Sequence, residues 1–273
     1  MIRAHKIPVF LRIFRGYNRF YLKRHFRRVM LDGDLDALAP QTGVPLLVCM
    51  NHTSWWDLLV GMLLEERMPA RNSYTAMDER QLKRYRFFSF LGVIGVDRTC
   101  LKGAREFTAH CAELLRGHKN TALWLTVQGE MVSARHRPIR FQPGAGWIAR
   151  EIGTFEVITV AIEYAFWEDR LPVAAISVSP AHTYSADKNF SRRRFTAELE
   201  QQLEEQCNQL AIKMEQRAPS VFTTILSGSG GIQPVYDVLR SLAAKLTGNN
   251  MDKAHGDIVT PGWRKGRGGD VQS

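Results

Sequence analysis

The segment Pro45-Leu46-Leu47-Val48-Cys49-Met50-Asn51-His52-Thr53-Ser54-Trp55-Trp56-Asp57 decides how the rest of the chain is interpreted. Its first six residues form an apolar run, which predicts a buried strand. The apolar residues between 58 and 64 predict a helix that follows at once. His52 is therefore expected at the carboxyl end of a strand, and Asp57 in the first turn of the helix, where the helix dipole favours a carboxylate. Ligands of open α/β sheets bind in the crevice outside such strand ends.

The pair formed by His52 and Asp57 suits general-base chemistry. A histidine can take a proton from a substrate hydroxyl near neutral pH, and a nearby carboxylate can orient its ring and stabilise the imidazolium that forms. Histidine and aspartate are also ordinary residues of loops and helix caps. The spacing alone leaves two interpretations open, a catalytic dyad and a capped helix start.

Further patterns predict the other elements of the fold. Short apolar runs predict strands at 92–96, 122–127, 156–163 and 173–178. Helical patterns occupy 78–91, 101–116, 144–152 and 191–217. Strands that alternate with helices predict an α/β fold, a mostly parallel twisted sheet with helices on both faces. Because parallel strands end at the same edge, we expect that edge to gather His52, Arg98, Gln128, Glu130 and Glu163.

The length and composition fit one main domain. A chain of 273 residues with 45% hydrophobic residues can bury a sizeable core. We place the α/β domain at 44–226, a linker and C-terminal helix at 227–248, and a disordered tail at 249–273. The four cysteines are far apart and form no Cys-x-x-Cys pair, which predicts reduced thiols and no metal site.

The positive charge is concentrated in an N-terminal arm. Residues 1–31 hold nine Lys or Arg and no acid, so the remaining 28 basic and 27 acidic residues carry only +1 of the net +10. Apolar residues recur there every three or four positions, which predicts an amphipathic helix. Such a helix suits the interface of an anionic bilayer. The residues expected to bind the membrane are Phe10, Arg12, Phe14, Arg15, Arg19 and Lys23.

The arm has two alternative interpretations, an ordinary core-packing helix and a nucleic-acid arm. Unstructured nucleic-acid arms do not need regular helical spacing, so we expect no nucleic-acid partner. No window of 18 or more apolar residues occurs, which argues against a transmembrane helix. Basic residues interrupt each apolar run of the arm, which argues against a secretory signal. We therefore expect a peripheral, monotopic protein at the cytoplasmic face of a membrane.

The segment 51–57 resembles Asn-His-x-Ser-x-x-Asp, the first signature of the glycerolipid (lysophospholipid) acyltransferase family. The best-known members of this family acylate 1-acyl-glycerol-3-phosphate. Residues 92–98 resemble the second block, a glycine-bounded apolar run that ends in Asp-Arg, and 157–164 is similar to the fourth. The resemblance covers about residues 44 to 180. It implies that His52 is the general base and Asp57 its orienting carboxylate.

The third block departs from the family pattern Phe-Pro-Glu-Gly-Thr-Arg-Ser. This chain has Thr126-Val127-Gln128-Gly129-Glu130-Met131-Val132, with Gln128 in place of the glutamate and Met131 in place of the arginine. Arginine is a planar, bidentate ligand of phosphate. Its replacement extends the range of expected acceptors beyond phosphate-bearing lipids.

The resemblance implies transfer of a fatty acyl group from acyl-CoA or acyl-ACP to a hydroxyl of a membrane lipid, with no further cofactor. The expected acceptor is a lysophospholipid, with a glycolipid, a carotenoid glycoside or an amino-lipid as alternatives. Two other classes remain open, a non-catalytic lipid-binding protein of the same fold and a His/Asp metal-dependent hydrolase. The residues expected to bind substrate are Arg98, Gln128, Gly129, Glu130, Arg137 and Arg140.

Overall fold

The structure is a computed structural model that describes residues 1–33, 43–67 and 71–228. The C-terminal helix and the tail expected from the sequence, and all but the first two residues of the linker, lie outside the described residues.

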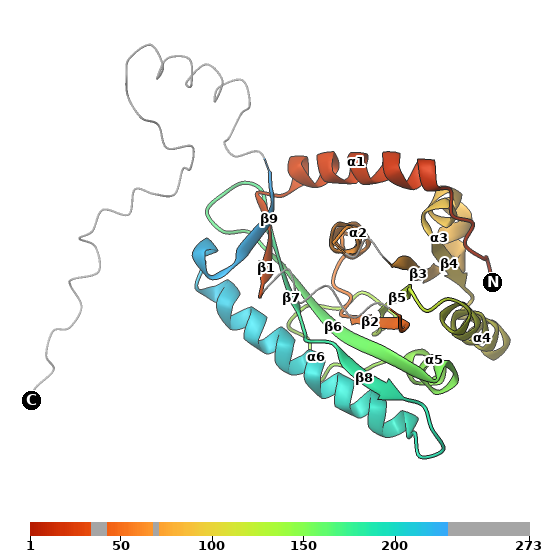
Figure 1. Cartoon of the computed structure of the whole chain (residues 1–273). Coiled ribbons are helices and arrows are strands. Elements are labelled where there is room, and N and C mark those ends of the chain that lie inside the picture. The colour runs from red at the N-terminus through yellow and green to blue at the C-terminus, as the bar shows by residue number, and fades with distance from the viewer. Residues whose placement is uncertain (34–42, 68–70, 229–273) are drawn as a thin grey trace, which may run out of the picture.

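In the described part of the chain, one sheet contains nine strands (Figure 1). Their order is β4-β3-β5-β2-β6-β7-β1-β9, and β8 pairs with β6. The strands are β1 Arg28–Asp32, β2 Leu46–Met50, β3 Asn72–Asp78, β4 Val93–Val96, β5 Thr121–Thr126, β6 Thr154–Ala165, β7 Val173–Val178, β8 His182–Ser185 and β9 Thr223–Ser227.

The strands from β4 to β6 run parallel, so their carboxyl ends meet at one edge of the sheet. The pairs β6/β7, β6/β8 and β1/β9 are antiparallel, and β1 is parallel to β7. The central strand β2 is buried along its whole length. Leu46, Val48 and Met50 enter one core, and Leu47 and Cys49 enter the other, as the two-residue period of a strand requires.

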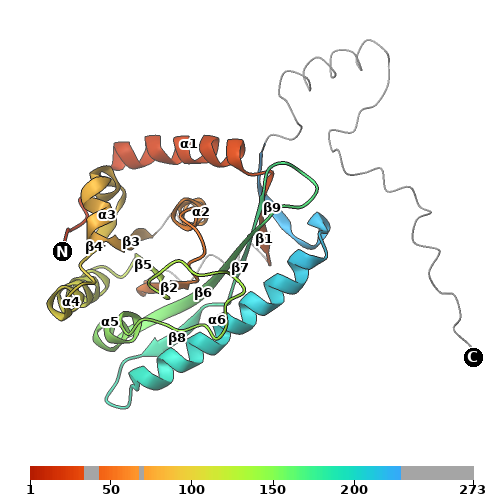
Figure 2. The same ribbon diagram turned by 180° about the vertical axis from the view of Figure 1, so that it is seen from behind.

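Helices cover both faces of the sheet (Figures 1 and 2). Leu22 of α1 and Leu59, Val60, Leu63 and Leu64 of α2 pack on one face. The opposite face packs against α4, α5 and α6. The helices are α1 Pro8–His25, α2 Asp57–Glu65, α3 Glu79–Arg84, η2 Arg86–Leu91, α4 Leu101–Gly117, α5 Gly144–Ile152, α6 Arg192–Glu215 and η3 Pro219–Val221.

The predicted fold class is confirmed, with several differences in detail. The sequence patterns missed β1, β3, β8 and β9 because none of them is a continuous apolar run. The helix expected at 78–91 is divided at Tyr85 into α3 and the 3-10 helix η2. Since β1 pairs with β7 inside the sheet, the sheet begins before residue 44 and takes in the last part of the segment assigned to the arm.

Helix α1 is fixed to the domain by polar contacts with α2. Arg15 and Arg19 form ion pairs with Glu65 and Glu66 at the end of α2. The buried side chain of Asn18 donates a hydrogen bond to the carbonyl of Leu59, with 2.9 Å between Nδ2 and O. Arg15 and Arg19, which the sequence assigned to membrane contact, therefore also bond to the domain, and 53% of the Arg19 side chain is exposed.

The four cysteines give a test of the core. All four thiols are free, and Cys100 alone among them is exposed. Burial raises the pKa of the Cys49 thiol to about 12 and raises the pKa of Cys207 to about 12. Burial also raises the pKa of Cys111. Because the thiolate is the reactive form, we expect one thiol per chain to react with Ellman's reagent within minutes at pH 8.

Unfolding in guanidinium should release the other three thiols. The Cys100→Ser variant should lose the fast phase and keep the slow ones. Two or more fast thiols in the native wild-type protein would contradict the packing described above.

Candidate active site

The loop between β2 and α2 brings His52 and Asp57 together. The distance from His52 Nδ1 to Asp57 Oδ2 is 2.8 Å. The Asp57 side chain is fully buried, whereas 19% of the His52 side chain is exposed. Asp57 is the first residue of α2, as the sequence indicated. The structure thus places a carboxylate inside the protein and an imidazole at its surface.

Asp57 accepts hydrogen bonds on both carboxylate oxygens. Oδ2 accepts from the backbone amides of Thr53 and Ser54 at 2.7 and 3.0 Å. Oδ1 accepts from the hydroxyl of Tyr164 at 2.7 Å and, at 3.4 Å, from the hydroxyl of Thr53. A buried carboxylate needs such partners because burial removes its hydration. They also fix the plane of the carboxylate relative to His52.

The contact with Asp57 sets the tautomer of His52. An ionised carboxylate only accepts hydrogen bonds, so the proton of the neutral ring lies on Nδ1. Nε2 then carries the lone pair, and it makes no hydrogen bond with any residue that the structure describes. A base with its lone pair directed away from the orienting carboxylate can take a proton from a bound hydroxyl.

The third block holds the backbone of His52. Gln128, the second residue after β5, accepts a hydrogen bond from the His52 amide through its side-chain oxygen at 2.8 Å. The amide of Val132 donates to the His52 carbonyl at 2.9 Å. Gln128, expected to bind substrate, therefore contacts the protein backbone through Oε1. Glu130 and Met131 are exposed on the same loop.

Arg98 joins the second block to the third. Its guanidinium donates to the carbonyl of Gly129. Gly129 has a φ of +75°, and a Cβ there would lie 2.6 Å from Cγ of Gln142. Glycine is required at this position both for its left-handed backbone and for the close approach of its neighbour. Arg98 is exposed.

The structure does not bring Arg137 and Arg140 to the dyad. Arg137 donates to Asn208 of α6, and Arg140 pairs with Glu200 of the same helix. Glu163, expected at the edge with His52, forms an ion pair with Arg135 at 2.8 Å. No sequence pattern predicted a role for Arg135 or Tyr164. Tyr164 lay within the segment likened to the fourth block, but hydropathy gives no signal for a single hydroxyl contact.

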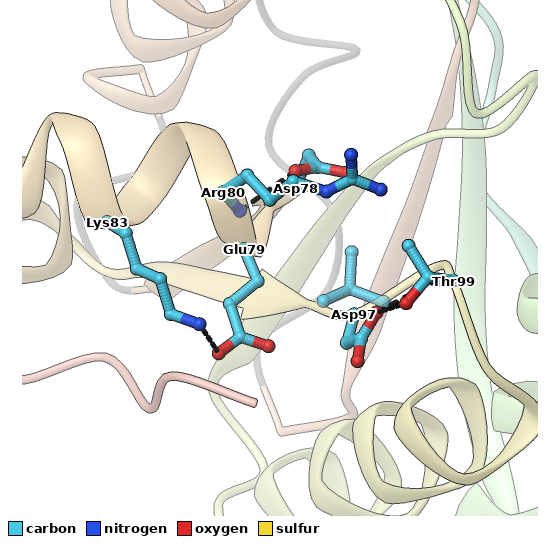
Figure 3. A pocket seen from close by; sticks show the side chains of 7 residues that line it. Asp78, Glu79, Arg80, Lys83, Asp97 and Thr99 are labelled. Carbon is cyan, nitrogen blue, oxygen red and sulfur yellow. Dashed lines mark hydrogen bonds and ion pairs between the residues drawn. The ribbon is translucent and has the colours of Figure 1, made fainter.

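A pocket of about 200 Å³ lies at the carboxyl ends of β3 and β4 (Figure 3). Its carboxylates are paired within the protein: Glu79 pairs with Lys83, and Asp78 and Asp97 accept from the backbone amides of Arg80 and Thr99. Hydrogen bonds from Thr99 lower the pKa of Asp97. None of the residues that line the pocket is bonded to His52 or Asp57. The pocket is therefore not part of the dyad.

In the three described ranges, no group of three or more His, Cys, Asp or Glu side chains is arranged to hold a metal ion.

The geometry agrees with a comparison against known families, in which residues 8–163 match the model of the Acyltransferase family. The chain belongs to the acyltransferase family. The match extends from α1 through the dyad and the third block into β6, so it includes the helix that the sequence analysis treated as a separate arm.

Among solved structures, the fold is similar to that of PlsC, the 1-acyl-sn-glycerophosphate (LPA) acyltransferase from Thermotoga maritima. The two chains share 14% sequence identity with a TM-score of 0.53, over 74% of this chain and 79% of that one. At this level of identity the likeness shows the fold alone. No curated protein matches the chain.

Asn51 bonds the start of the loop between β2 and α2, which holds His52, to strand β6 of the sheet. Its side chain donates to the carbonyl of Ile162 at 2.9 Å and accepts from the amide of Ile162 at 2.8 Å. The contact is buried, and it joins the end of β2 to the middle of β6 just before His52.

Asn51→Ala leaves the amide and the carbonyl of Ile162 buried without these partners. Each loss costs about 1–3 kcal/mol, so we expect the two losses together to lower the free energy of unfolding in urea by about 2–6 kcal/mol. Asn208→Ala, which removes an exposed amide on α6, should change it by less than about 1 kcal/mol. Equal effects of the two substitutions would contradict the role given to Asn51.

Proposed function

We propose that the protein transfers a fatty acyl group from an acyl thioester, on coenzyme A or acyl carrier protein, to a hydroxyl of a membrane lipid. The observation that carries the proposal is the His52–Asp57 contact, which leaves Nε2 of His52 without a partner among the described residues. The family match supports acyl transfer as the reaction class. The position of the dyad, at the edge where parallel strands end, supports ligand binding there.

The reaction requires only protein groups and the two substrates. Nε2 of His52 accepts the hydroxyl proton as the acceptor oxygen bonds to the thioester carbonyl carbon. The tetrahedral intermediate collapses, the carbon–sulfur bond breaks, and the thiolate takes the proton from the imidazolium. Asp57 stabilises the imidazolium between the two steps. The products are the ester and the free thiol, and no acyl-enzyme forms.

The acceptor that we propose first is a lysophospholipid, with Arg98 as the residue that binds its anionic head group. Arg98 is exposed beside the third block, and the guanidinium geometry suits phosphate. Met131 is 56% exposed at the position where the family pattern has an arginine, which favours a second candidate class. This class comprises acceptors with a neutral head group, such as a glycolipid, a carotenoid glycoside or an amino-lipid.

The dyad is tested by His52→Ala. General-base catalysis contributes about 10²–10⁴-fold to a rate, so thiol release from acyl-CoA or acyl-ACP in the presence of an acceptor should fall by about that factor. His136→Ala, which removes an exposed histidine of the third-block loop, should keep the wild-type rate. The assay should compare lysophosphatidic acid, monoacylglycerol and a glycolipid as acceptors. An active alanine variant would end the proposed mechanism.

The competing proposal is a non-catalytic lipid-binding protein of the same fold, and it predicts no acyl transfer. It requires that wild-type protein bind lipid while no acceptor of the panel is acylated from either donor. Lipid extracts from cells with and without the protein, compared by mass spectrometry, extend this test to acceptors outside the panel.

We also propose that the outer face of α1 binds the membrane. Val9, Ile13, Tyr17 and Phe20 are spaced by three or four residues, and each is between 52% and 67% exposed. The exposed basic residues Arg12, Lys23 and Arg24 lie on the same helix. An apolar stripe with adjacent cations suits an anionic bilayer surface, which supports a peripheral position at the cytoplasmic leaflet. No helix in the described part of the chain is long and apolar enough to cross a bilayer.

This face differs from the set expected from the sequence. Phe10 lies 6.0 Å from Phe90 of η2, measured between ring centroids, and Phe14 lies 6.1 Å from Phe87. These two aromatic residues pack against the domain, as Arg15 and Arg19 do. Of the six residues first expected at the membrane, Arg12 and Lys23 remain in the proposed face.

The triple variant Val9→Ser/Ile13→Ser/Phe20→Ser should lose most of its sedimentation with phosphatidylglycerol-rich vesicles, at least about tenfold in partition coefficient. Arg12→Gln/Lys23→Gln should weaken binding chiefly at low salt, because salt screens exposed charges. Ile212→Ser removes a 54% exposed side chain on α6 and should have no effect. If the triple variant binds like the wild-type protein, α1 is not the docking face.

A further inference from the structure

Tyr164 lies beside the dyad and contacts it directly. It is the second-to-last residue of β6, and its hydroxyl donates to Oδ1 of Asp57 at 2.7 Å. The other oxygen of Asp57, Oδ2, contacts His52. The two carboxylate oxygens thus have different partners, with the phenol on one and the imidazole on the other.

The direction of the hydrogen bond follows from the chemistry of the pair. An ionised carboxylate has no proton to donate, so the phenol is the donor. Burial, the charge of Asp57 and the hydrogen bond to it all raise the pKa of Tyr164 well above its ordinary value. The phenol therefore keeps its proton at neutral pH.

Packing holds the ring of Tyr164 in place. Its centroid lies 5.8 Å from that of Phe26, which in turn contacts Trp56 at 4.8 Å. The backbone of Tyr164 pairs with Ala174 of β7 in the antiparallel register. The hydroxyl is thus presented to Asp57 from a strand whose position the sheet determines.

We propose that Tyr164 is a positioning residue for the dyad, holding Asp57 so that Oδ2 faces His52 and drawing part of the carboxylate charge toward Oδ1. The inference rests on the proposed role of His52 as general base. It gives Tyr164, near the end of β6, a function that the hydrophobic pattern of the strand does not predict. Tyr164 acts through Asp57 and has no contact with the exposed Nε2 side of the imidazole.

Loss of the phenolic hydroxyl has two physical consequences. The carboxylate loses a charge-assisted hydrogen bond, and such bonds fix geometry more strongly than neutral ones. The negative charge left on Asp57 is then less dispersed, so it stabilises the imidazolium form of His52 more strongly. The neutral, catalytically useful imidazole is consequently populated only at higher pH.

Other charged groups at this corner come from separate elements and are unaffected by the change. His25 of α1 contacts Trp56, with 5.4 Å between ring centroids. Arg98, after β4, binds the carbonyl of Gly129. Arg135, after β5, pairs with Glu163 of β6. Each of these contacts remains when Tyr164 becomes phenylalanine.

The experiment compares Tyr164→Phe with wild type in the full-length protein. We expect kcat to fall about tenfold or more, which is part of the roughly 10²–10⁴-fold that a positioned acid–base catalyst contributes. KM for the acyl thioester should stay within about twofold. The acid limb of the pH–kcat profile should move upward by about half a pH unit or more. Tyr184→Phe, which removes a hydroxyl on β8 from the other face of the sheet, should match wild type.

A second measurement does not depend on activity. The imidazole resonances of His52, assigned by comparison with His52→Ala, can be followed by NMR through a pH titration. We expect their midpoint to move upward in Tyr164→Phe and not in Tyr184→Phe. This shift would be seen even if no acceptor is acylated, so failure of the proposed function and failure of the inference are distinguishable.

Two results would overturn the inference. One is a Tyr164→Phe variant whose kcat, acid limb and titration midpoint all equal those of wild type. The other is a variant with a lower kcat and a lower thermal midpoint of unfolding, but with the acid limb and the NMR titration midpoint of wild type. That result would make Tyr164 a residue of the core only. If Tyr164→Phe fails to fold, Thr53→Val can replace it, because this substitution removes the other hydroxyl that donates to Oδ1 of Asp57. The NMR midpoint of His52 should then still move upward. An unmoved midpoint would count against charge dispersal through Oδ1.

Discussion

The buried carboxylate of Asp57 is the constraint on which this corner of the protein depends. A charge without solvent must be surrounded by donors, and here the donors come from His52, from the backbone of the loop after β2, and from Tyr164 at the end of β6. Satisfying one carboxylate therefore fixes a loop, a helix start and a strand end relative to one another. Of the His52 imidazole, 19% is exposed, so this donor also reaches the surface.

The third block has a supporting role in the same arrangement. Gln128 and Val132 hold the backbone of His52 from opposite sides, and Arg98 holds the block itself through Gly129. An amide oxygen at residue 128 can accept the His52 N–H without a formal charge. The departure from the family pattern at this position is thus compatible with an intact dyad.

Much of the fold could be predicted because the central strands are uniformly apolar. The alternation of strands such as β2 with helices such as α4 sets the class of fold, and the loop after β2 could be placed at the correct edge. The strand β3 could not be predicted, because its residues after Ser73 are only partly buried and its sequence mixes Asn, Ser, Tyr and Thr. In the site, His52 and Asp57 were within reach of sequence reasoning because they are five residues apart. The contact from Tyr164 spans 107 residues, and the faces of α1 depend on Glu65 and Glu66 of another helix.

The attachment of α1 to α2 has a consequence for how a lipid substrate would meet His52 in the proposed reaction. Because Arg15, Asn18 and Arg19 bond α1 to α2, the helix and the domain form one rigid unit. The orientation of α1 on a bilayer would therefore set the orientation of the whole molecule. Tyr21 of α1 also contacts Trp55 and Trp56, which lie in the segment between His52 and Asp57. An acceptor diffusing laterally in its leaflet would then encounter the imidazole at a fixed height and angle, and the search for a productive encounter would be reduced from three dimensions to two.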